Sequence, residues 1–265
     1  MRESGSKLAV IEGARPVIEA LRARRRRIHE VSLPEGDGSP ARRELEALLA
    51  GAGIRVRASG PSQGVRALAD PYPEEDFEVL LATGSPRLLV ALDRVTDVGN
   101  LGSIARTAEA AGASGLILEH RHAPPIAAGA LRASAGALEH LRVGRTPNLA
   151  RALRLAAAEG VAVLVAEAGG PPIERLAAEV LLGDLIWVFG SEDRGVRPGV
   201  RHQAHASVGI PLSGETASLG VAAAAAYLLL RTAEIRRDGE TEAKLGSGFR
   251  AHDASQMPGG TNEIS

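Results

Sequence analysis

The sequence predicts an α/β protein with two domains, of which the larger, C-terminal one is built on a mostly parallel sheet. From Arg87 onward, short apolar runs alternate with longer segments of helical periodicity, which is the pattern of a parallel sheet with helices on both faces. Residues 67–86 are rich in Pro, Gly and Asp, which favour turns, so we expect a linker there. The length of 265 residues suits one or two domains.

The N-terminal domain, residues 1–66, is expected to be a small α/β unit. Helices are predicted at 16–26 and 41–50, and strands at 29–33 and 54–58. Pro16 is acceptable in the first turn of a helix, and Gly51 ends the second helix.

The C-terminal domain, residues 87–236, carries the regular part of the pattern. Strands are predicted at 88–92, 115–118, 161–166, 185–189 and 208–210, and helices at 99–111, 126–133, 149–159 and 217–236. The last helix is long and strongly apolar. Residues 237–265 are rich in Gly, Ser, Thr and Glu without apolar periodicity, so we expect a disordered tail.

The composition narrows the function classes. The chain has no cysteine, which excludes disulfides, thiolate nucleophiles and cysteine-based metal sites and fits a reducing cytoplasm. Aromatic residues make up only 2%, which disfavours RNA binding by stacking platforms. The N-terminus lacks the long apolar region of a secretory signal, and the longest apolar run, 219–230, is shorter than the roughly 20 residues that span a bilayer. We therefore expect a cytoplasmic protein with no metal and no membrane partner.

Positive charge is supplied almost entirely by arginine, because lysine occurs only at Lys7 and Lys244. Arginine is the better bidentate ligand of phosphate, but a GC-rich genome gives the same bias without functional meaning, and that is the simpler explanation. The arginine run at 22–27 fits contact with RNA phosphates and equally fits a solvated helix end. The net charge of −1 does not exclude RNA, since a local patch matters more than the sum.

Three glycine-containing loops follow predicted strands of the C-terminal domain, where ligands of open α/β sheets bind. In the first loop, Asn100 stands near the start of a helix, where its side chain suits a cap, and Arg106 lies close to the same face. Gly102, between them, allows close approach of another segment. A capped helix with a surface arginine is the alternative interpretation.

The second loop runs from a buried strand into Gly190, Ser191 and Glu192, so that glycine allows a ligand near the backbone and a carboxylate stands at the mouth. The third loop passes from Ile210 to Ser218, whose hydroxyl suits a cap for the apolar helix that follows. An ordinary strand-to-helix loop is the alternative for the second, and a buried core helix or an oligomer face is the alternative for the third.

Together, in this order and spacing, the loops resemble the three signature motifs of the SPOUT superfamily, in the TrmH/SpoU branch that methylates ribose 2′-hydroxyls of RNA. The matching residues are Asn100, Gly102 and Arg106 in the first motif, Gly190, Ser191, Glu192 and Gly195 in the second, and Ile210, Pro211, Gly214, Ser218, Leu219 and Val221 in the third. The segment 133–137 also looks like a recurring piece of this family, and the residues around Gly13 and Pro16 are similar to its ribosomal-protein-like RNA-binding domain.

The resemblance implies a C-terminal domain tied in a trefoil knot, a homodimer with the third-motif helix in its interface, and S-adenosylmethionine as cofactor. It implies that Gly190, Ile210 and Leu219 bind the cofactor through backbone groups. It also implies catalytic roles for Arg106 at the target hydroxyl and for Asn100, Glu192 and Ser218 in positioning. A guanidinium is always protonated, so orienting the hydroxyl and stabilising negative charge suit Arg106 better than acting as a base.

The family resemblance favours ribosomal RNA as substrate, in particular 23S rRNA, with tRNA as the alternative. One departure affects activity: Gly220 stands where the family usually has Asn, and glycine has no amide to donate or accept. Asp193 stands where the family often has Gly, which is a milder departure. A catalytically degenerate RNA-binding or ribosome-assembly protein is therefore the second hypothesis, and an antibiotic-resistance methyltransferase is a third that shares the chemistry.

Overall fold

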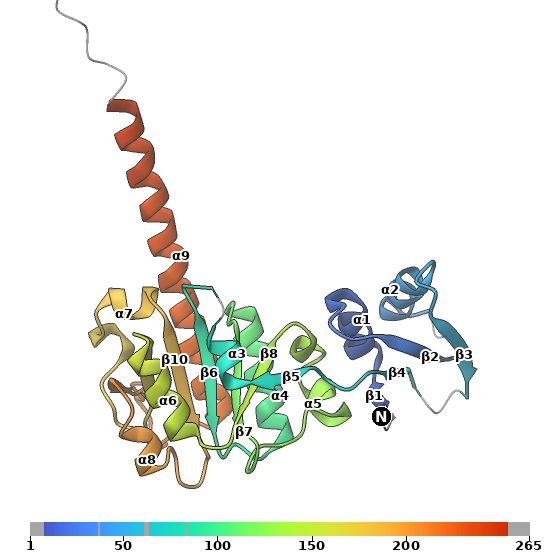
Figure 1. The fold of residues 1–265 in the computed structure, drawn as a ribbon, viewed down its shortest axis with the longest axis horizontal. Helices are drawn as coiled ribbons and strands as arrows, with labels where there is room; N and C mark the ends of the chain where they lie inside the picture. The colour runs from blue at the N-terminus through green and yellow to red at the C-terminus, as the bar shows by residue number, and fades with distance from the viewer. Residues whose placement is uncertain (1–7, 37, 61–63, 83, 254–265) are drawn as a thin grey trace, which may run out of the picture.

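The structure is a computed structural model that describes residues 8–36, 38–60, 64–82 and 84–253, with side chains described up to Thr241. Two sheets form the centres of two domains that lie side by side, and helix α9 projects from the larger one (Figure 1). The α/β class and the division into a small and a large domain agree with the sequence analysis.

The N-terminal domain is a four-stranded sheet with two helices on one face. Its elements are β1 (Ala9–Glu12), α1 (Ala14–Ala23), β2 (Ile28–Pro34), α2 (Pro40–Leu49), β3 (Arg55–Ser59) and β4 (Arg66–Ala69), and the strand order is β1-β4-β2-β3. Alternate strand residues such as Ile11, Val31 and Ala67 are buried against Val17 and Leu45 of the helices. The opposite face of the sheet has no helix on it in Figure 1.

The stretch 67–86, expected as a linker, differs from that expectation because most of it belongs to the two sheets. Strand β4 closes the N-terminal sheet by pairing with both β1 and β2. Strand β5 (Glu74–Asp76) joins the large sheet beside β8, and α3 (Phe77–Leu81) buries Phe77, Leu80 and Leu81 in the large domain. The connection between the sheets is therefore residues 70–73, where Pro71 and Pro73 restrict the chain.

The C-terminal domain is built on seven strands whose pairings are all parallel, in the order β11-β9-β10-β6-β7-β8-β5. The strands not yet named are β6 (Leu88–Asp93), β7 (Gly115–Glu119), β8 (Arg142–Thr146), β9 (Ala162–Ala166), β10 (Leu185–Gly190) and β11 (Ala206–Val208). Every residue of β6, β7 and β10 is buried. Continuous apolar runs are what a strand covered on both faces requires, so the predicted parallel sheet is confirmed.

Helices cover both faces of this sheet. They are α4 (Val98–Ala110), α5 (Ala128–Ala133), α6 (Leu149–Ala158), α7 (Ala178–Leu182), α8 (Pro198–Arg201) and α9 (Val221–Asp253), with short 3-10 helices η1 (Ala137–Glu139) and η2 (Ile173–Arg175). Along β6, Leu88 and Val90 pack in the core cluster that includes α4 and α9, whereas Leu89 and Ala91 pack in the cluster that includes α6. Successive residues therefore serve opposite layers.

Helix α9 departs from its predicted bounds at both ends. It begins at Val221 and not at 217, because residues 211–220 form a loop over the ends of the strands. It continues to Asp253 through most of the expected tail. Just before that tail, Arg236 donates to the carbonyl of Leu181 at 2.7 Å. Glu, Ala, Lys and Leu in this stretch are good helix formers, and adding residues to an existing helix is easier than starting one. The remaining residues of the expected tail, 254–265, lie outside the described residues.

Among the helices of the described chain, none combines the length and apolar character that crossing a membrane requires.

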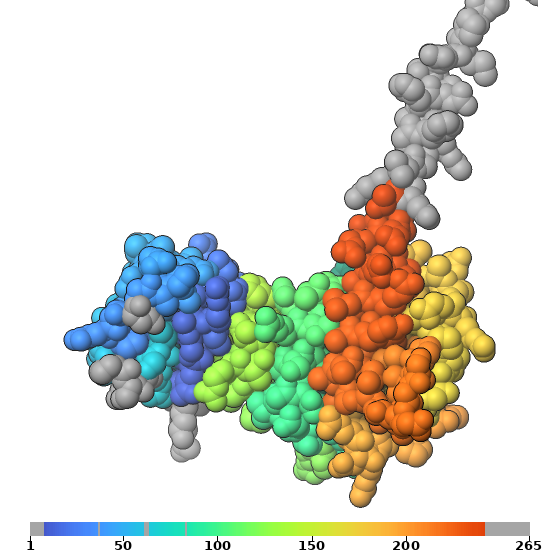
Figure 2. All heavy atoms as spheres, turned by 180° about the vertical axis from the view of Figure 1, so that it is seen from behind, coloured from blue at the N-terminus to red at the C-terminus, as the bar shows by residue number. Residues whose placement is uncertain are grey.

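Buried polar contacts join the two domains, in addition to a shared apolar core. Arg26 and Glu139 form an ion pair in which only 2% and 1% of the side chains are exposed. The hydroxyl of buried Tyr72 lies 2.7 and 2.6 Å from the carbonyl oxygens of Leu138 and Leu141. In Figure 2 the blue N-terminal domain meets the rest of the molecule at the yellow-green segment that contains η1. The domains are thus held together by groups that are satisfied only across the junction.

The contacts at this junction argue against one interpretation of the arginine run at 22–27, namely that the run as a whole contacts RNA phosphates. Arg25 contacts the carbonyl of Leu141, and Arg26 pairs with Glu139, so these two residues hold the domains together and are not placed to bind phosphate. Arg22 pairs with Glu19 and Glu44 within its own domain. Arg24 and Arg27 are exposed and make no side-chain hydrogen bond or ion pair among the described residues, although the pKa of Asp70 is lowered by its hydrogen bond with His29 and also by the charge of Arg27.

Candidate cofactor and active site

A cavity of about 250 Å³ lies at the carboxyl ends of β9, β10 and β11, and the loop that precedes α9 forms part of its wall. Its floor is apolar and includes Phe189, Val208, Val221 and Leu228. The sequence-predicted residues that line it are Gly190, Glu192, Ile210, Ser218 and Leu219. Two of the three loops singled out in the sequence therefore meet at one cavity, in the position expected for an open parallel sheet.

Glycines let the backbone close tightly around this cavity. A Cβ at Gly190 would stand 2.1 Å from the carbonyl carbon of Gly195, and one at Gly209 would stand 2.4 Å from the carbonyl oxygen of Gly170. The close approach at Gly190 was expected to admit a ligand, but the structure fills it with the second loop's own backbone. The loop is fixed there by the Gly195 N–H, which donates to the Ser191 carbonyl at 2.8 Å.

The first loop reaches the cavity through Asn100. Its side-chain amide donates to Oε1 of Glu192 at 3.2 Å and so joins the first and second loops. The expected capping role of Asn100 is wrong, because Asp97 caps α4 by accepting from the Asn100 N–H at 2.7 Å. The Asn100 side chain is consequently directed to Glu192. Gly102 does allow close approach: a Cβ there would lie 2.4 Å from Cβ of Ala133, where α4 packs on α5.

Ser218, Leu219 and Gly220 belong to the loop and not to α9. The expected cap from Ser218 is therefore wrong, since the first helical residue is Val221 and the Gly220 carbonyl accepts the first helical hydrogen bond, from Ala224. Ser218 and Leu219 line the cavity. A Cβ at Gly220 would lie 3.3 Å from Oε1 of Glu192. The pair formed by Asn100 and Glu192 thus stands directly against the residue that departs from the resembled motif.

Arg106 is not brought to this cavity within one chain. It is exposed on α4, it is absent from the cavity lining, and its side chain makes no hydrogen bond or ion pair with the described residues. It lies six positions after Asn100, which is about 9 Å along a helix at 1.5 Å per residue. A single copy therefore assembles Asn100, Glu192 and Ser218, but leaves the predicted arginine outside.

A buried charge cluster beneath the second loop was not foreseen. Arg197 donates from Nε to Oδ1 of Asp93 at 2.6 Å and pairs through Nη2 with Oε2 of Glu119 at 2.9 Å. Burial alone would lower the pKa of Arg197, but the contacts with Glu119 and Asp93 outweigh it and raise that pKa. Asp93 and Glu119 end β6 and β7, so the cluster ties the second loop to the neighbouring strand ends. An acidic residue at the end of an apolar strand was the available signal.

Among the described residues, no group of three or more His, Asp or Glu side chains is arranged to hold a metal ion. The polar atoms near the cavity are a carboxylate, an amide, a hydroxyl and peptide groups. Such a set suits an organic ligand with a nucleoside-like apolar part and polar ends.

Residues 87–230, more than half of the chain, match the family described as SpoU rRNA Methylase. The chain belongs to this family. Residues 10–61 match a second description, RNA 2′-O ribose methyltransferase substrate binding, which coincides with the N-terminal domain. The expected membership of the TrmH/SpoU branch is thereby confirmed, and the SpoU domain contains all the residues predicted for the site. The trefoil knot stays a prediction.

Relatives and solved structures agree with this membership. An uncharacterised tRNA/rRNA methyltransferase of Mycolicibacterium vanbaalenii is 36% identical over 188 residues, which cover 69% of this chain and 59% of the relative. The chain thus spans less than two thirds of the length of the curated relatives it matches. The SpoU methyltransferase AviRb from Streptomyces viridochromogenes, in complex with AdoMet, shares the fold with a TM-score of 0.75 at 23% identity, covering 88% of this chain and 92% of that one. The AdoMet-bound rRNA methyltransferase from Sinorhizobium meliloti gives a TM-score of 0.66 at 26% identity, covering 86% and 87%.

Proposed function

We propose that this protein transfers a methyl group from S-adenosylmethionine to a ribose 2′-hydroxyl of RNA, with 23S rRNA as the favoured substrate and tRNA as the alternative. The observation that carries the proposal is the cavity at the strand ends, which is lined by residues of the second and third SpoU motifs and is joined to the first motif by Asn100. The SpoU membership and the AdoMet-bound structures of two similar proteins support the choice of cofactor.

The residues of the cavity fit this cofactor. The apolar floor suits the nucleoside part, and the peptide groups of Gly190, Ile210 and Leu219 at the rim suit its polar groups. When bound, the cofactor supplies an electrophilic methyl group on a sulfonium. The tight loop fixed by Gly190 and Gly195 holds the rim rigid, which favours a single bound orientation.

The remaining site residues act on the ribose. Asn100 holds the Glu192 carboxylate in place by donating to its Oε1, and the carboxylate can accept a hydrogen bond from the hydroxyl to be methylated. Arg106 orients the hydroxyl and stabilises the negative charge that develops on its oxygen as the proton passes to the Glu192 carboxylate and the oxygen takes the methyl group. Ser218 adds a donor and an acceptor at the edge of the cavity.

The position of Arg106 supports a homodimer as the active form. Arg106 lies away from the cavity of its own chain, so a second copy is needed to place an arginine there. Helix α9 starts at the cavity and carries Tyr227 and Leu230, whose side chains are 40% and 50% exposed. Covering large apolar side chains is favourable, so this face of α9 is the proposed contact. Leu230→Glu is expected to give a monomer by sedimentation and to lose methyl transfer.

The test combines calorimetry with a methyl-transfer assay. We expect micromolar binding of S-adenosylmethionine, and transfer of a tritiated methyl group to 23S rRNA but not to tRNA. Arg106→Gln is expected to lower transfer by about 100-fold, the effect of removing one preorganised charge donor, while cofactor binding is unchanged. Transfer to tRNA alone would show that tRNA, and not 23S rRNA, is the substrate. Absence of incorporation into any RNA would overturn the proposal.

A second function, RNA binding by a catalytically degenerate member, rests on one observation. Gly220 provides no side chain beside Glu192, where the resembled motif has an amide. Such a protein is expected to bind 23S rRNA and to show no cofactor binding in the same calorimetric experiment. Measurable cofactor binding with methyl transfer would exclude it.

A further inference from the structure

The open face of the N-terminal sheet carries a row of polar side chains in register. Ser32 of β2 pairs with Arg57 of β3 on one side and with Arg66 of β4 on the other, and Arg66 pairs with Glu12 of β1. Directly paired residues point to the same face of a sheet, and neighbouring strands lie about 4.8 Å apart. The row therefore crosses all four strands over roughly 14 Å.

The row continues onto the catalytic domain. Arg132, the penultimate residue of α5, donates from Nη1 to Oε2 of Glu12 at 3.0 Å, and Nη2 of Arg66 lies 3.5 Å from Oε1 of the same carboxylate. A hollow at this junction is lined by Glu12, Gly13, Gly64, Val65, Arg66 and Arg132. One carboxylate thus holds two guanidinium groups from different domains at the edge of a single hollow.

This surface is exposed and positively charged. The side chains of Arg57, Arg66 and Arg132, which we call the arginine stripe, are 60%, 49% and 64% exposed. With Arg55, four arginines stand against the two carboxylates of Glu12 and Glu30. A guanidinium has five N–H donors, so an ion pair with one carboxylate oxygen leaves donors free for a phosphate.

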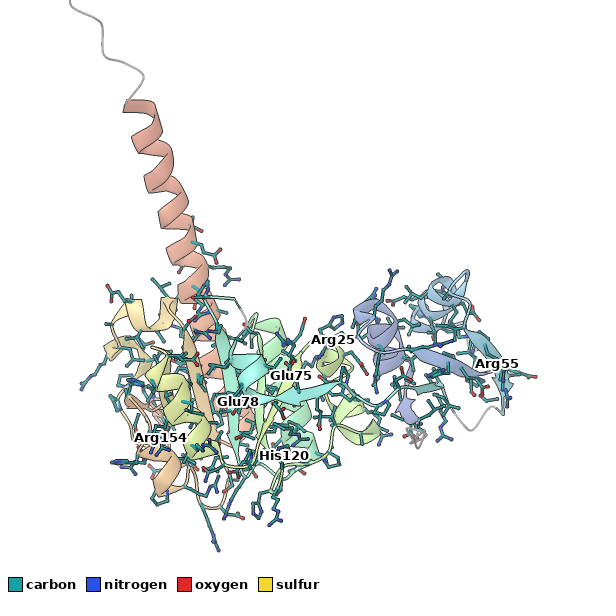
Figure 3. All side chains as sticks on the ribbon, in the orientation of Figure 1. Arg25, Arg55, Glu75, Glu78, His120 and Arg154 are labelled. Atoms are coloured by element: carbon teal, nitrogen blue, oxygen red, sulfur yellow. The ribbon has the colours of Figure 1, made fainter. Side chains whose placement is uncertain are left out.

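The stripe lies on the same side of the molecule as the strand ends that form the candidate site. In the view of Figure 1, α1 and α2 lie above the N-terminal sheet, and its open face is turned toward the lower edge. Figure 3 shows His120, which follows β7, at that lower edge of the large domain, and Arg55 at the far end of the small one. An RNA strand bound across the face of the N-terminal sheet can therefore continue toward the carboxyl ends of the strands in the large sheet.

Resting on the function proposed above, we infer that the arginine stripe binds the phosphates of the substrate RNA and guides it from the N-terminal domain to the catalytic domain. The stripe reads charge and not sequence, because phosphate contacts fix position without distinguishing bases and the face offers no aromatic ring for stacking. Glu12 pairs with two of the three guanidinium groups and partly neutralises their charge.

The test measures binding of purified 23S rRNA to the full chain at several salt concentrations. Neutralising the stripe with R57Q, R66Q and R132Q together is expected to raise Kd at least tenfold at 100 mM salt. It is also expected to reduce the slope of log K against log salt by about 2 to 3, since each phosphate contact contributes about 0.7 to 0.9. Each single variant is expected to reduce the slope by about 1 and serves if the triple variant fails to fold.

A matched control removes the same charge from the helix side of the same domain with R15Q, R22Q and R43Q, which is expected to change the slope by less than 1. Glu12→Gln tests the direction: it removes a negative charge from the stripe, so RNA binding should tighten. Weaker binding in Glu12→Gln, or an equal slope for stripe and control variants, would overturn the inference.

The methyl-transfer assay separates this inference from the proposed function. The stripe variant is expected to raise KM for 23S rRNA and to leave kcat and cofactor binding unchanged. Stripe-dependent RNA binding by a wild-type protein that transfers no methyl group would sink the proposed function alone. Methyl transfer with the same KM in wild type and stripe variant would sink the stripe alone.

Discussion

At the scale of single residues, the small size of Gly220 leaves space beside Glu192 in the candidate site. A Cβ at this position would lie 3.3 Å from Oε1 of Glu192, the oxygen that Asn100 also contacts. Glu192 is exposed and its carboxylate is the far end of a flexible side chain, so it can move by a few tenths of an ångström. An asparagine is therefore tolerated at 220, and its side chain would point at the Glu192 and Asn100 pair.

Gly220→Asn is expected to raise the rate of methyl transfer about fivefold, because one added hydrogen bond contributes about 1 kcal/mol and 1.4 kcal/mol corresponds to a factor of ten. Asparagine also suits the residue that precedes a helix. Gly220→Ala is the matched control, which fills the space without an amide and should give no gain. A fall in rate at unchanged cofactor affinity would show instead that the present contact of Asn100 with Glu192 is the one the reaction uses.

The sequence was informative about residues that belong to motifs and uninformative about isolated ones. Five predicted residues line the cavity: Gly190, Glu192 and Ser218 stand in loops that follow apolar strands, and Ile210 and Leu219 were expected there from the family resemblance. Asp93 and Glu119 carry the same signal, an acidic residue at the end of an apolar strand, but nothing in the sequence connects them to Arg197, because the three lie far apart in the chain and become one cluster only through strand order. The capping roles expected of Asn100 and Ser218 failed because Asp97 competes for one helix and the other begins later.

At the scale of elements, Arg87 and Asp184 join the starts of two paired central strands. Arg87 precedes β6 and Asp184 precedes β10, and the backbone N–H of Arg87 donates to Asp184 at 2.7 Å. The hydrogen bond with the Arg87 side chain lowers the pKa of Asp184 from 3.8 to about 2, against the opposing effect of burial. A lowered pKa in the folded state means that the unfolded chain takes up the proton first as acid is added.

The stability supplied by Asp184 is expected to be complete above about pH 4 and to be lost as the pH falls toward about 2, given its folded pKa of about 2. Asp184→Asn removes this contribution, so the variant should be less stable than wild type at pH 6, and the two unfolding curves should converge near pH 2. Urea unfolding across this range measures the difference. A gap that stays constant down to pH 2 would show that Asp184 acts without regard to its charge.

The sequence predicted the helices and strands that form because of apolar periodicity, but it missed a strand that pairs through charged side chains. Strand β5 consists of two glutamates and an aspartate, and β8 contains two arginines. They pair because Arg142 and Arg145 contact Glu75 and Glu74 across the strands, with distances of 2.6 Å in both pairs. A hydropathy pattern cannot detect such a pair, so the sequence showed a linker where the structure has the edge of the sheet.

At the scale of the whole molecule, the buried pair Arg26 and Glu139 holds the two domains in one arrangement. Arg26 also donates to the carbonyl of Asp70 at 3.1 Å, so it contacts the connection between the sheets as well. Neither side chain has access to water that would replace its partner. A fixed arrangement is what an RNA-guiding surface shared by both domains requires.

Glu139→Gln is expected to lower the free energy of unfolding by about 3 kcal/mol, because it leaves the Arg26 charge buried without a counter-charge. The double variant with R26M and E139L should recover most of this loss, since apolar side chains of similar size carry no desolvation penalty. Denaturant unfolding of both variants measures the effect. A loss below 1 kcal/mol in Glu139→Gln would mean that water reaches this junction.

The central claim, methyl transfer to a ribose 2′-hydroxyl, is tested most directly by locating the transferred methyl group. After incubation of the wild-type chain with tritiated S-adenosylmethionine and 23S rRNA, the RNA is hydrolysed with alkali. Alkaline cleavage needs a free 2′-hydroxyl, so a 2′-O-methyl group protects the neighbouring bond. We predict that the label is recovered in alkali-resistant dinucleotides. Label in mononucleotides, which indicates methylation of a base, or no label in any RNA, would contradict the account.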